Sequence, residues 1–150
     1  MRFNHMELTL PRGTLSDKGR KEISAFYSEI FGWGSIDVEL FDQKNLLLHT
    51  DDEVSQFILL SEKDKPMHSP SFDHLGCLVD TRAEVDDLHE RCERYRERDD
   101  RVQILKYDDL DQKVVVIHAF YVKYILPIYF DVQCMEWTPE AKPARDWTYG

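Results

Sequence analysis

The strongest constraint on the fold is an order of elements that occurs twice, once on each side of a central break. The segment KDKPMHSPS, residues 63–71, holds two prolines and divides the chain into parts of similar length. In each part a strand-like segment precedes a helix pattern, and three strand-like segments follow. The 150 residues are predicted to form one α+β domain of two β-α-β-β-β modules, at about 1–62 and 72–137, with a tail at 138–150.

Capping residues mark both predicted helices. Ser16 can cap the start of the first helix and Gly32 can end it. Between them apolar residues recur at helical spacing, namely Ile23, Phe26, Tyr27, Ile30 and Phe31. Thr81 and Glu84 form a capping box at the start of the second helix. Both helices are therefore expected to bury one face against the strands.

Three strands combine an apolar face with a more polar one. Strand-like segments occupy residues 3–10, 36–41, 45–50, 56–60, 72–79, 102–107, 113–123 and 128–137. Because successive side chains of a strand point to opposite faces, His5, His74 and Asp131 fall opposite the apolar positions of their strands. Two imidazoles and a carboxylate around one concavity can hold a divalent metal and leave coordination positions open. The sequence separations are long, so no local motif is involved.

Composition excludes several classes of protein. The formal net charge is −10, which disfavours a nucleic-acid partner because phosphate backbones would be repelled. No apolar run approaches the roughly 20 residues of a membrane span, and no secretory or transit signal is recognisable, so neither a membrane partner nor export is expected. The cysteines, Cys77, Cys92 and Cys134, form no CxxC motif and are expected to be reduced thiols. A cytoplasmic location is the expectation.

Four segments together resemble one protein family. They are FNHMELTL, FYSEIFGW, FDHLGCLVD and HAFYVKYILPIYFDVQ, and with their order they cover about residues 3–136. In this respect the chain resembles the vicinal oxygen chelate superfamily, which includes glyoxalase I, extradiol dioxygenases, and bleomycin- and fosfomycin-resistance proteins. The resemblance implies that the modules curl into an eight-stranded open barrel of mixed sheet with the helices outside.

The resemblance also implies a metal site. His5 and His74 match the first-strand histidines of the two modules, and Asp131 stands where the family usually offers Glu. The metal could be Fe, Mn, Zn or Ni. Tyr121 lies ten residues before Asp131, as a tyrosine does in extradiol dioxygenases, and would hydrogen-bond the substrate or assist proton transfer. Strand alternation places the rival His118 on the opposite, helix-packed face.

Further residues are candidates for substrate binding. Tyr129 and Gln133 flank Asp131 on its own face, and His49 ends a strand of the first module. They could also be barrel filling, and His49 is the weakest candidate of the three.

Several functions remain open at this level. A divalent-metal-dependent enzyme acting on a small vicinal-oxygen substrate is preferred, most like an extradiol dioxygenase and next like a glyoxalase-type isomerase or lyase. The alternative is a metal-free protein that sequesters a small molecule, as bleomycin-resistance proteins do. A third reading is an accessory subunit, for which Trp147 in the tail is the only hint. A homodimer and a monomer are both compatible with a chain that carries both modules.

Overall fold

The computed structural model describes residues 3–40 and 42–144. Trp147, the residue that hinted at a partner-binding tail, lies outside the described residues. No helix in the described part of the chain is both long enough and apolar enough to cross a membrane.

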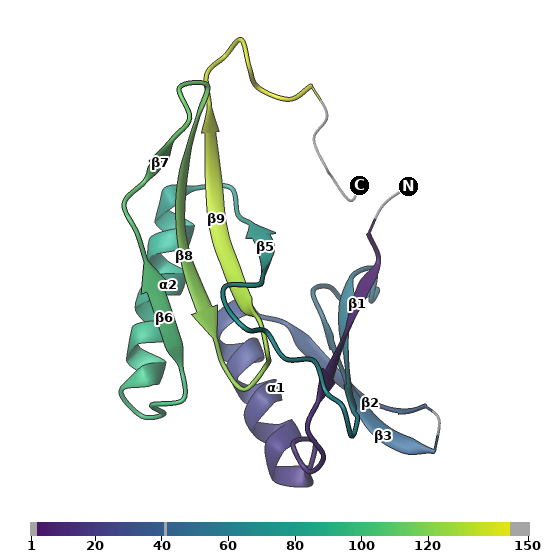
Figure 1. The fold of residues 1–150 in the computed structure, drawn as a ribbon. Helices are drawn as coiled ribbons and strands as arrows, with labels where there is room; N and C mark the ends of the chain where they lie inside the picture. The colour runs from purple at the N-terminus through teal and green to yellow at the C-terminus, as the bar shows by residue number, and fades with distance from the viewer. Residues whose placement is uncertain (1–2, 41, 145–150) are drawn as a thin grey trace.

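The observed elements follow the predicted order, with one short strand added (Figure 1). They are β1 (His5–Leu10), α1 (Asp17–Phe31), β2 (Gly34–Leu40), β3 (Gln43–His49), β4 (Phe57–Glu62), β5 (His74–Leu78), α2 (Arg82–Arg96), β6 (Gln103–Lys106), β7 (Leu110–Asp111), β8 (Val115–Lys123) and β9 (Tyr129–Trp137). The added strand β7 has only two residues and lies in an Asp-rich stretch, which in sequence is typical of a turn.

The strands form two mixed sheets, one for each module. The first sheet has the order β1-β4-β3-β2, and the second has the order β5-β9-β8-β6 with β7 also paired to β8. In each sheet the first and last strands of the module pair in parallel, and the remaining pairs are antiparallel. The α+β class and the mixed sheets are as predicted, but the sheets do not close into one barrel. The reason is that the described strands pair only within their own module.

The helix ends confirm the predicted caps. The Ser16 hydroxyl accepts a hydrogen bond of 3.2 Å from the Gly19 N–H at the start of α1. Gly32 ends α1 in the left-handed conformation, at φ 70°, which glycine adopts without steric cost. At α2, Thr81 and Glu84 form both hydrogen bonds of the capping box. Both ends of α1 and the start of α2 are therefore set by local chemistry that can be read from the sequence.

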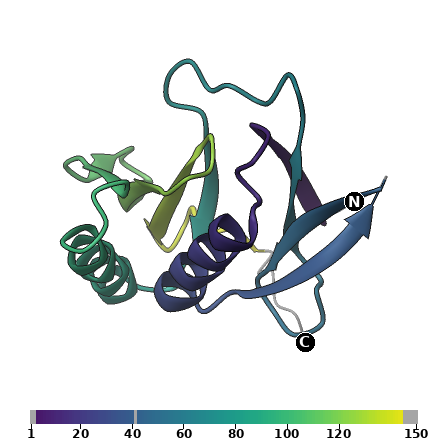
Figure 2. The same cartoon turned by 90° about the horizontal axis from the view of Figure 1, so that it is seen from below.

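Helix α1 joins the two modules. Figure 2 shows α1 and α2 side by side, with the second sheet above them and the first sheet beyond α1. The ring of Phe26 stacks on Tyr124 at a centroid distance of 4.4 Å, and the Tyr27 ring contacts Phe130 at 5.4 Å. These side chains are fully buried, and burial of such a side chain contributes about 2–3 kcal/mol. An element of the first module is thus part of the core of the second.

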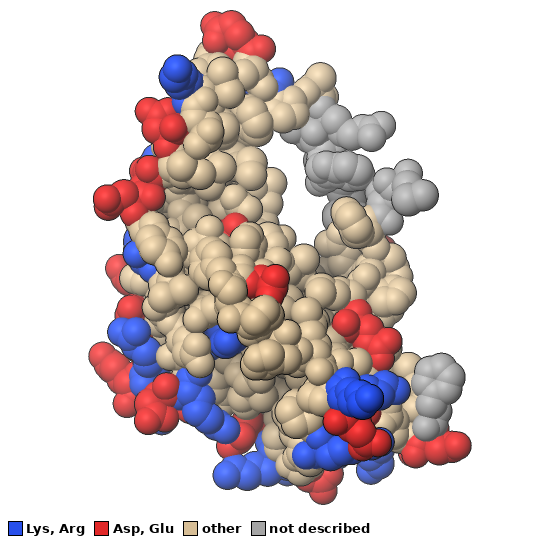
Figure 3. Space-filling view, in the orientation of Figure 1, with Lys and Arg blue, Asp and Glu red and all other residues tan. Residues whose placement is uncertain are grey.

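Each sheet packs one face on the helices and leaves the other face open. The packed faces carry buried residues such as Leu8 and Leu60 in the first sheet and Phe120 and Val132 in the second. The open faces carry the predicted site residues. Figure 3 shows that acidic and basic side chains gather beside α2 and β6 and at the lower end, whereas few lie over β5, β8 and β9.

Candidate metal centre

Three predicted site residues meet on the open face of the second sheet. Strand β9 runs between β5 and β8, so that Asp131 lies directly opposite Gly76 on one side and Tyr121 on the other. His74 lies two positions before Gly76 on the same face, and its Nε2 is 3.8 Å from Asp131 Oδ2. We call His74, Asp131 and Tyr121 the second-sheet cluster. The strand register therefore assembles an imidazole, a carboxylate and a phenol from three different strands.

The Asp131 carboxyl group is buried and incompletely paired. The residue is only 6% exposed, and its Oδ1 atom is buried without any hydrogen-bond partner. Burial raises the pKa of Asp131, while the nearby His74 acts in the opposite direction. A buried polar atom without a partner costs free energy of about 1–3 kcal/mol. A cation at this position would provide the missing interaction, so the carboxyl group fits a metal-binding role.

The His74 ring is held in an orientation suited to a metal ligand. Its Nδ1 lies 2.9 Å from the carbonyl oxygen of Phe72. Because a carbonyl can only accept a hydrogen bond, Nδ1 carries a proton, and in the neutral ring Nε2 then has the lone pair. This is the arrangement in which a backbone acceptor orients a metal-binding imidazole. The lone pair of Nε2 is thus available on the side where Asp131 lies.

Aromatic rings pack against the second-sheet cluster. Phe72 lies in the middle, with its ring centroid 5.4 Å from His74, 4.6 Å from Tyr121 and 5.7 Å from Tyr129. Burial, together with Asp131, raises the pKa of Tyr121, so its hydroxyl stays protonated and can donate a hydrogen bond. Phe72 is absent from the site predicted by sequence. Phe72 could have been predicted from its position two residues before His74, since this places both side chains on the same face of an extended segment.

Gly76 allows the Gln133 amide to approach the backbone of β5 closely. It has no side chain and lies directly opposite Asp131, and a Cβ atom added there would lie 3.2 Å from Gln133 Nε2. Gln133, a predicted substrate contact, is therefore next to the cluster. Tyr129, the second predicted contact, is buried, and its hydroxyl donates a hydrogen bond of 3.1 Å to Gln103 Oε1. Gly76 is absent from the site predicted by sequence.

The remaining candidates lie on the first sheet. Phe57 stands opposite His5 on one side and opposite His49 on the other. The His5 ring stacks on Phe57 at 4.8 Å, and its Nδ1 lies 2.9 Å from Asn4 Oδ1. His49 instead donates from Nδ1 to the Asp51 carbonyl at 2.7 Å. We call His5, Phe57 and His49 the first-sheet row. His5 resembles His74 in having its Nδ1 engaged and its Nε2 available.

A single chain does not bring His5 to the second-sheet cluster. Strand β1 makes no close backbone contact with β5 or β9, and Figure 1 shows them apart. Within residues 3–40 and 42–144, no three His, Cys, Asp or Glu side chains gather in a way that could hold a metal ion. Two of the predicted ligands, His74 and Asp131, are neighbours, and the third belongs to a sheet that does not pair with theirs. The three-ligand set stays a prediction.

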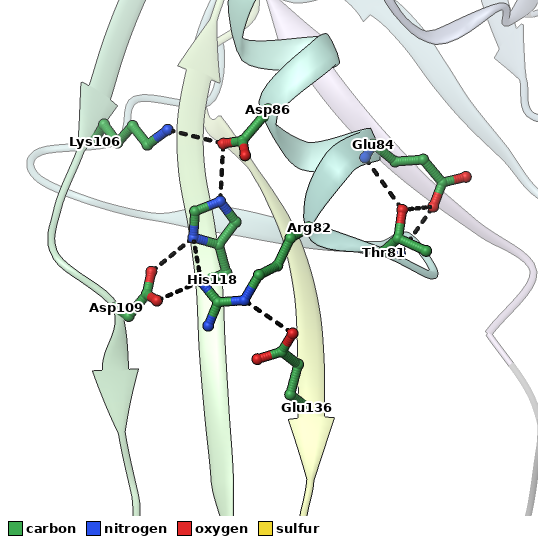
Figure 4. A network of polar contacts seen from close by, with 8 residues as sticks. All are labelled: Thr81, Arg82, Glu84, Asp86, Lys106, Asp109, His118 and Glu136. Carbon is green, nitrogen blue, oxygen red and sulfur yellow. Dashed lines mark hydrogen bonds and ion pairs between the residues drawn. The ribbon is translucent and has the colours of Figure 1, made fainter.

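His118 lies on the other face of the second sheet, in a polar network with α2 (Figure 4). Its Nδ1 is 2.6 Å from Asp109 Oδ1, and its Nε2 is 2.9 Å from Asp86 Oδ1. The hydrogen bond to Asp109 raises the pKa of His118, against the opposing effect of burial. Arg82 binds Asp109 and Glu136 beside it. Both ring nitrogens of His118 are occupied, so this histidine has no atom free for a ligand.

Comparison with known proteins finds the fold in solved structures only. No protein-family model matches the sequence, and no curated protein matches it either. A protein described as a glyoxalase family member from Bacillus anthracis superimposes with a TM-score of 0.62 at 15% identity, covering 91% of this chain and 96% of that one. A glyoxylase/bleomycin resistance protein/dioxygenase domain from Frankia sp. EAN1pec gives 0.57 at 17% identity, covering 91% and 93%.

A third similar structure carries ligands. It is a mutant of the fosfomycin resistance protein FosX from Listeria monocytogenes, in complex with Mn(II) and a dihydroxypropylphosphonic acid. Its TM-score is 0.64 at 16% identity, covering 96% of this chain and 98% of that one. These proteins belong to the vicinal oxygen chelate superfamily. The chain therefore has the fold of that superfamily.

Proposed function

We propose that this chain, with the fold of the vicinal oxygen chelate superfamily, is a divalent-metal-dependent enzyme acting on a small substrate with two adjacent oxygen atoms. The observation that carries the proposal is the pair formed by His74 and Asp131, in which a buried carboxylate oxygen has no partner. The imidazole offers Nε2 and the carboxylate offers oxygen, a donor set that suits Mn, Fe, Zn and Ni. The Mn(II) in the FosX structure makes manganese the first metal to test.

The residues in and around the second-sheet cluster would have different roles in the reaction. A divalent metal there would act as a Lewis acid that stabilises negative charge developing on a substrate oxygen. Tyr121, a protonated phenol directly opposite Asp131 on β8, would donate a hydrogen bond to that oxygen. The Phe72 and Tyr129 rings would exclude water from one side of the substrate. Gln133 would contact the substrate beside Gly76.

The third ligand, in this proposal, is His5 of a second copy of the chain. Large apolar side chains are exposed on the open faces of both sheets. Leu78, Tyr107, Leu110 and Met135 are on the face of the second-sheet cluster, and Phe3, Ile36 and Leu40 are on the face of the first-sheet row. Exposed apolar patches of this kind mark interaction surfaces. In a twofold dimer the same two patches meet twice, which would bring each His5 to the other copy's His74 and Asp131.

Two chemistries are ranked within the proposal. An extradiol-type dioxygenase comes first, because Tyr121 lies across from Asp131 in the strand register. A glyoxalase-type isomerase or lyase comes second, because it would use the same ligands without needing Tyr121. The rival from another class is a metal-free protein that sequesters a small molecule, and the aromatic rings around Phe72 favour it. Metal binding separates the rival from both enzymes.

The first experiment is elemental analysis of tag-free protein reconstituted anaerobically with Mn, Fe, Zn and Ni in turn. We expect near-stoichiometric metal in the native protein and in the control His89→Ala, whose histidine lies on α2 away from the cluster. We expect no bound metal in His74→Ala. Metal-free native protein under every condition would exclude the enzyme and favour the sequestering protein.

A mixing experiment tests whether the third ligand, His5, comes from a second copy of the chain. His5→Ala and His74→Ala, each inactive in metal binding alone, would be unfolded together and refolded as mixed dimers. If the site is shared between copies, each mixed dimer regains one intact site of its two, because one chain supplies His5 and the other supplies His74 and Asp131. If the site belongs to a single chain, mixing restores no metal binding.

A further inference from the structure

A cavity of about 450 Å³ lies at one end of the open face of the second sheet. Gln103 of β6 and Lys123 of β8 line it from the sheet, and Met67 and His68 line it from the segment that links the modules. Neither His74 nor Asp131 is among its lining residues. The cavity is thus a separate compartment beside the second-sheet cluster, and none of the site residues predicted from the sequence lines it.

Lys123 gives the cavity an uncompensated positive charge. Unlike Lys106, which pairs with Asp86, Lys123 makes no ion pair with any described residue, and its ammonium lies 4.8 Å from the centre of the Tyr129 ring. The other cation of the lining, Arg101, is already paired with Asp99 and Glu22. In a chain of net charge −10, a free ammonium directed into a cavity is the group that an anionic ligand would meet.

Gln103 adds a neutral hydrogen-bond donor next to Lys123. Its Oε1 accepts the hydrogen bond from the Tyr129 hydroxyl, which leaves the amide N–H groups to donate elsewhere. Residues 103 and 123 lie directly opposite one another in the β6–β8 pair, so both side chains are on the same face. An ammonium and an amide side by side match the oxygens of a carboxylate or a phosphate.

The turn after β8 holds this side of the cavity in a strained backbone conformation. Ile125, which lines the cavity, has a φ of 61°, in the left-handed region that a β-branched residue rarely adopts. The Leu126 N–H donates to the Tyr124 carbonyl at 2.6 Å, which closes a three-residue turn around Ile125. Strained residues of this kind persist where the surrounding structure requires them, and they concentrate at ligand-binding sites.

We propose that this cavity binds the carboxylate or phosphate group of a small anionic molecule through Lys123 and Gln103. Lys123 is two residues along β8 from Tyr121, a step of about 7 Å on the same face, and its ammonium lies over the Tyr129 ring. If the proposed function holds, the anion is one end of the substrate, and the adjacent oxygens at its other end face His74, Asp131 and Tyr121. The substrate class is then an acid or a phosphate ester with a vicinal-oxygen group.

The test is a titration of metal-free protein with inorganic phosphate and, separately, with benzoate, at constant ionic strength in chloride. Backbone amide signals in ¹H–¹⁵N NMR spectra would report the site and the dissociation constant. We expect saturable shifts clustered at residues 103, 123, 125 and 129. Lys123→Met, which keeps the apolar stem, should weaken binding by about tenfold or more, and Lys123→Arg should retain it. The probe that binds more tightly identifies the anion as phosphate or carboxylate.

The matched control is Lys106→Met, which removes one positive charge from the opposite face of β6, where Lys106 binds Asp86. It should bind either probe within about twofold of the native protein. Equal weakening in both variants, or no saturable binding in the native protein, would overturn the proposal. The result is independent of the proposed function, since metal is absent from the titration. If the anion binds but elemental analysis finds no metal, the proposed anion site is retained and the proposed metalloenzyme function is rejected.

Discussion

Two histidine–aspartate groups occupy opposite faces of the second sheet, and they differ in how completely their polar atoms are paired. On the helix-packed face, His118 contacts Asp86 and Asp109 at 2.9 and 2.6 Å. On the open face, His74 is 3.8 Å from Asp131, and Asp131 Oδ1 has no hydrogen-bond partner. The same residue types are thus used in two ways within one sheet.

The difference separates an interaction that stabilises the fold from one that is suited to a ligand. A polar network whose members are all paired rigidifies the structure around it. A buried group without a partner calls for a specific explanation, such as an ion or a substrate. The hydrogen bonds of His118 connect α2 to the strands. Asp131, in contrast, has a carboxylate oxygen at the open face that no protein group binds. Geometry therefore favours His74 over His118 as a ligand, although both are histidines beside aspartates.

The largest expected change in stability follows from a substitution on the helix-packed face. His118→Gln removes the charge that Asp86 and Asp109 share, and we expect the free energy of unfolding to fall by about 1–2 kcal/mol. Urea unfolding followed by circular dichroism measures this change. Metal binding should stay within about twofold of native, since His118 faces away from the second-sheet cluster. A variant that loses metal but keeps its stability would reverse the roles of the two histidines.

The pH dependence of stability should also come from this face. The pKa of His118 is raised in the folded state, so its contribution is complete below the unfolded value of about 6.5 and is lost as pH rises through the folded pKa. Asp86 and Asp109 have lowered pKa values, so their contributions are lost only in acid. The free energy of unfolding of the native protein minus that of His118→Gln should therefore fall as pH rises from about 6 to 8. The subtraction cancels the contributions of His89, whose pKa is lowered, and of the cysteine thiols, whose pKa values are raised. A difference that rises with pH instead would contradict the assignment.

The smallest change in stability is expected for a substitution on the open face, and there stability should rise instead of fall. Asp131→Asn removes a buried carboxylate that lacks a complete set of partners, so metal-free protein should gain about 0.5–1 kcal/mol, or about 2 °C in Tm. Differential scanning calorimetry in the presence of a chelator measures this gain. The same variant should lose metal binding. A loss of stability as large as that of His118→Gln would show that Asp131 is structural after all.

Strand alternation alone separates the two faces of each strand, because the period of two is a local property of an extended chain. It put His74 and Asp131 on the more polar faces of their strands and Tyr121 and His118 on opposite faces, whereas the family resemblance was needed to group Tyr121 with the two ligands. It could not place His5, since alternation states which face of its own sheet a residue occupies and not which other sheet that face meets. It also left Lys123 unnoticed, although this residue shares a face with Tyr121 two positions earlier.

The short strand β7 and the packing of α1 show a second limit. Two residues in an Asp-rich stretch carry too little pattern to indicate a strand. The apolar stripe of α1 indicates a buried face, yet Phe26 and Tyr27 contact Tyr124 and Phe130 of the other module as well as their own surroundings. A helical stripe gives the direction of burial but not the identity of its partner. Tertiary packing decides that identity.

The parallel pairing of β5 with β9 has a consequence for protein synthesis. His74 and Asp131 are separated by 57 residues, and α2, β6, β7 and β8 are all translated between them. A ribosome adding about 5–20 residues each second therefore needs several seconds after His74 to produce its neighbour. During that interval the nascent chain lacks the carboxylate of the pair. If the pair binds metal as proposed, uptake at His74 and Asp131 has to follow synthesis of the last strand, so the site can assemble only late in the production of the chain.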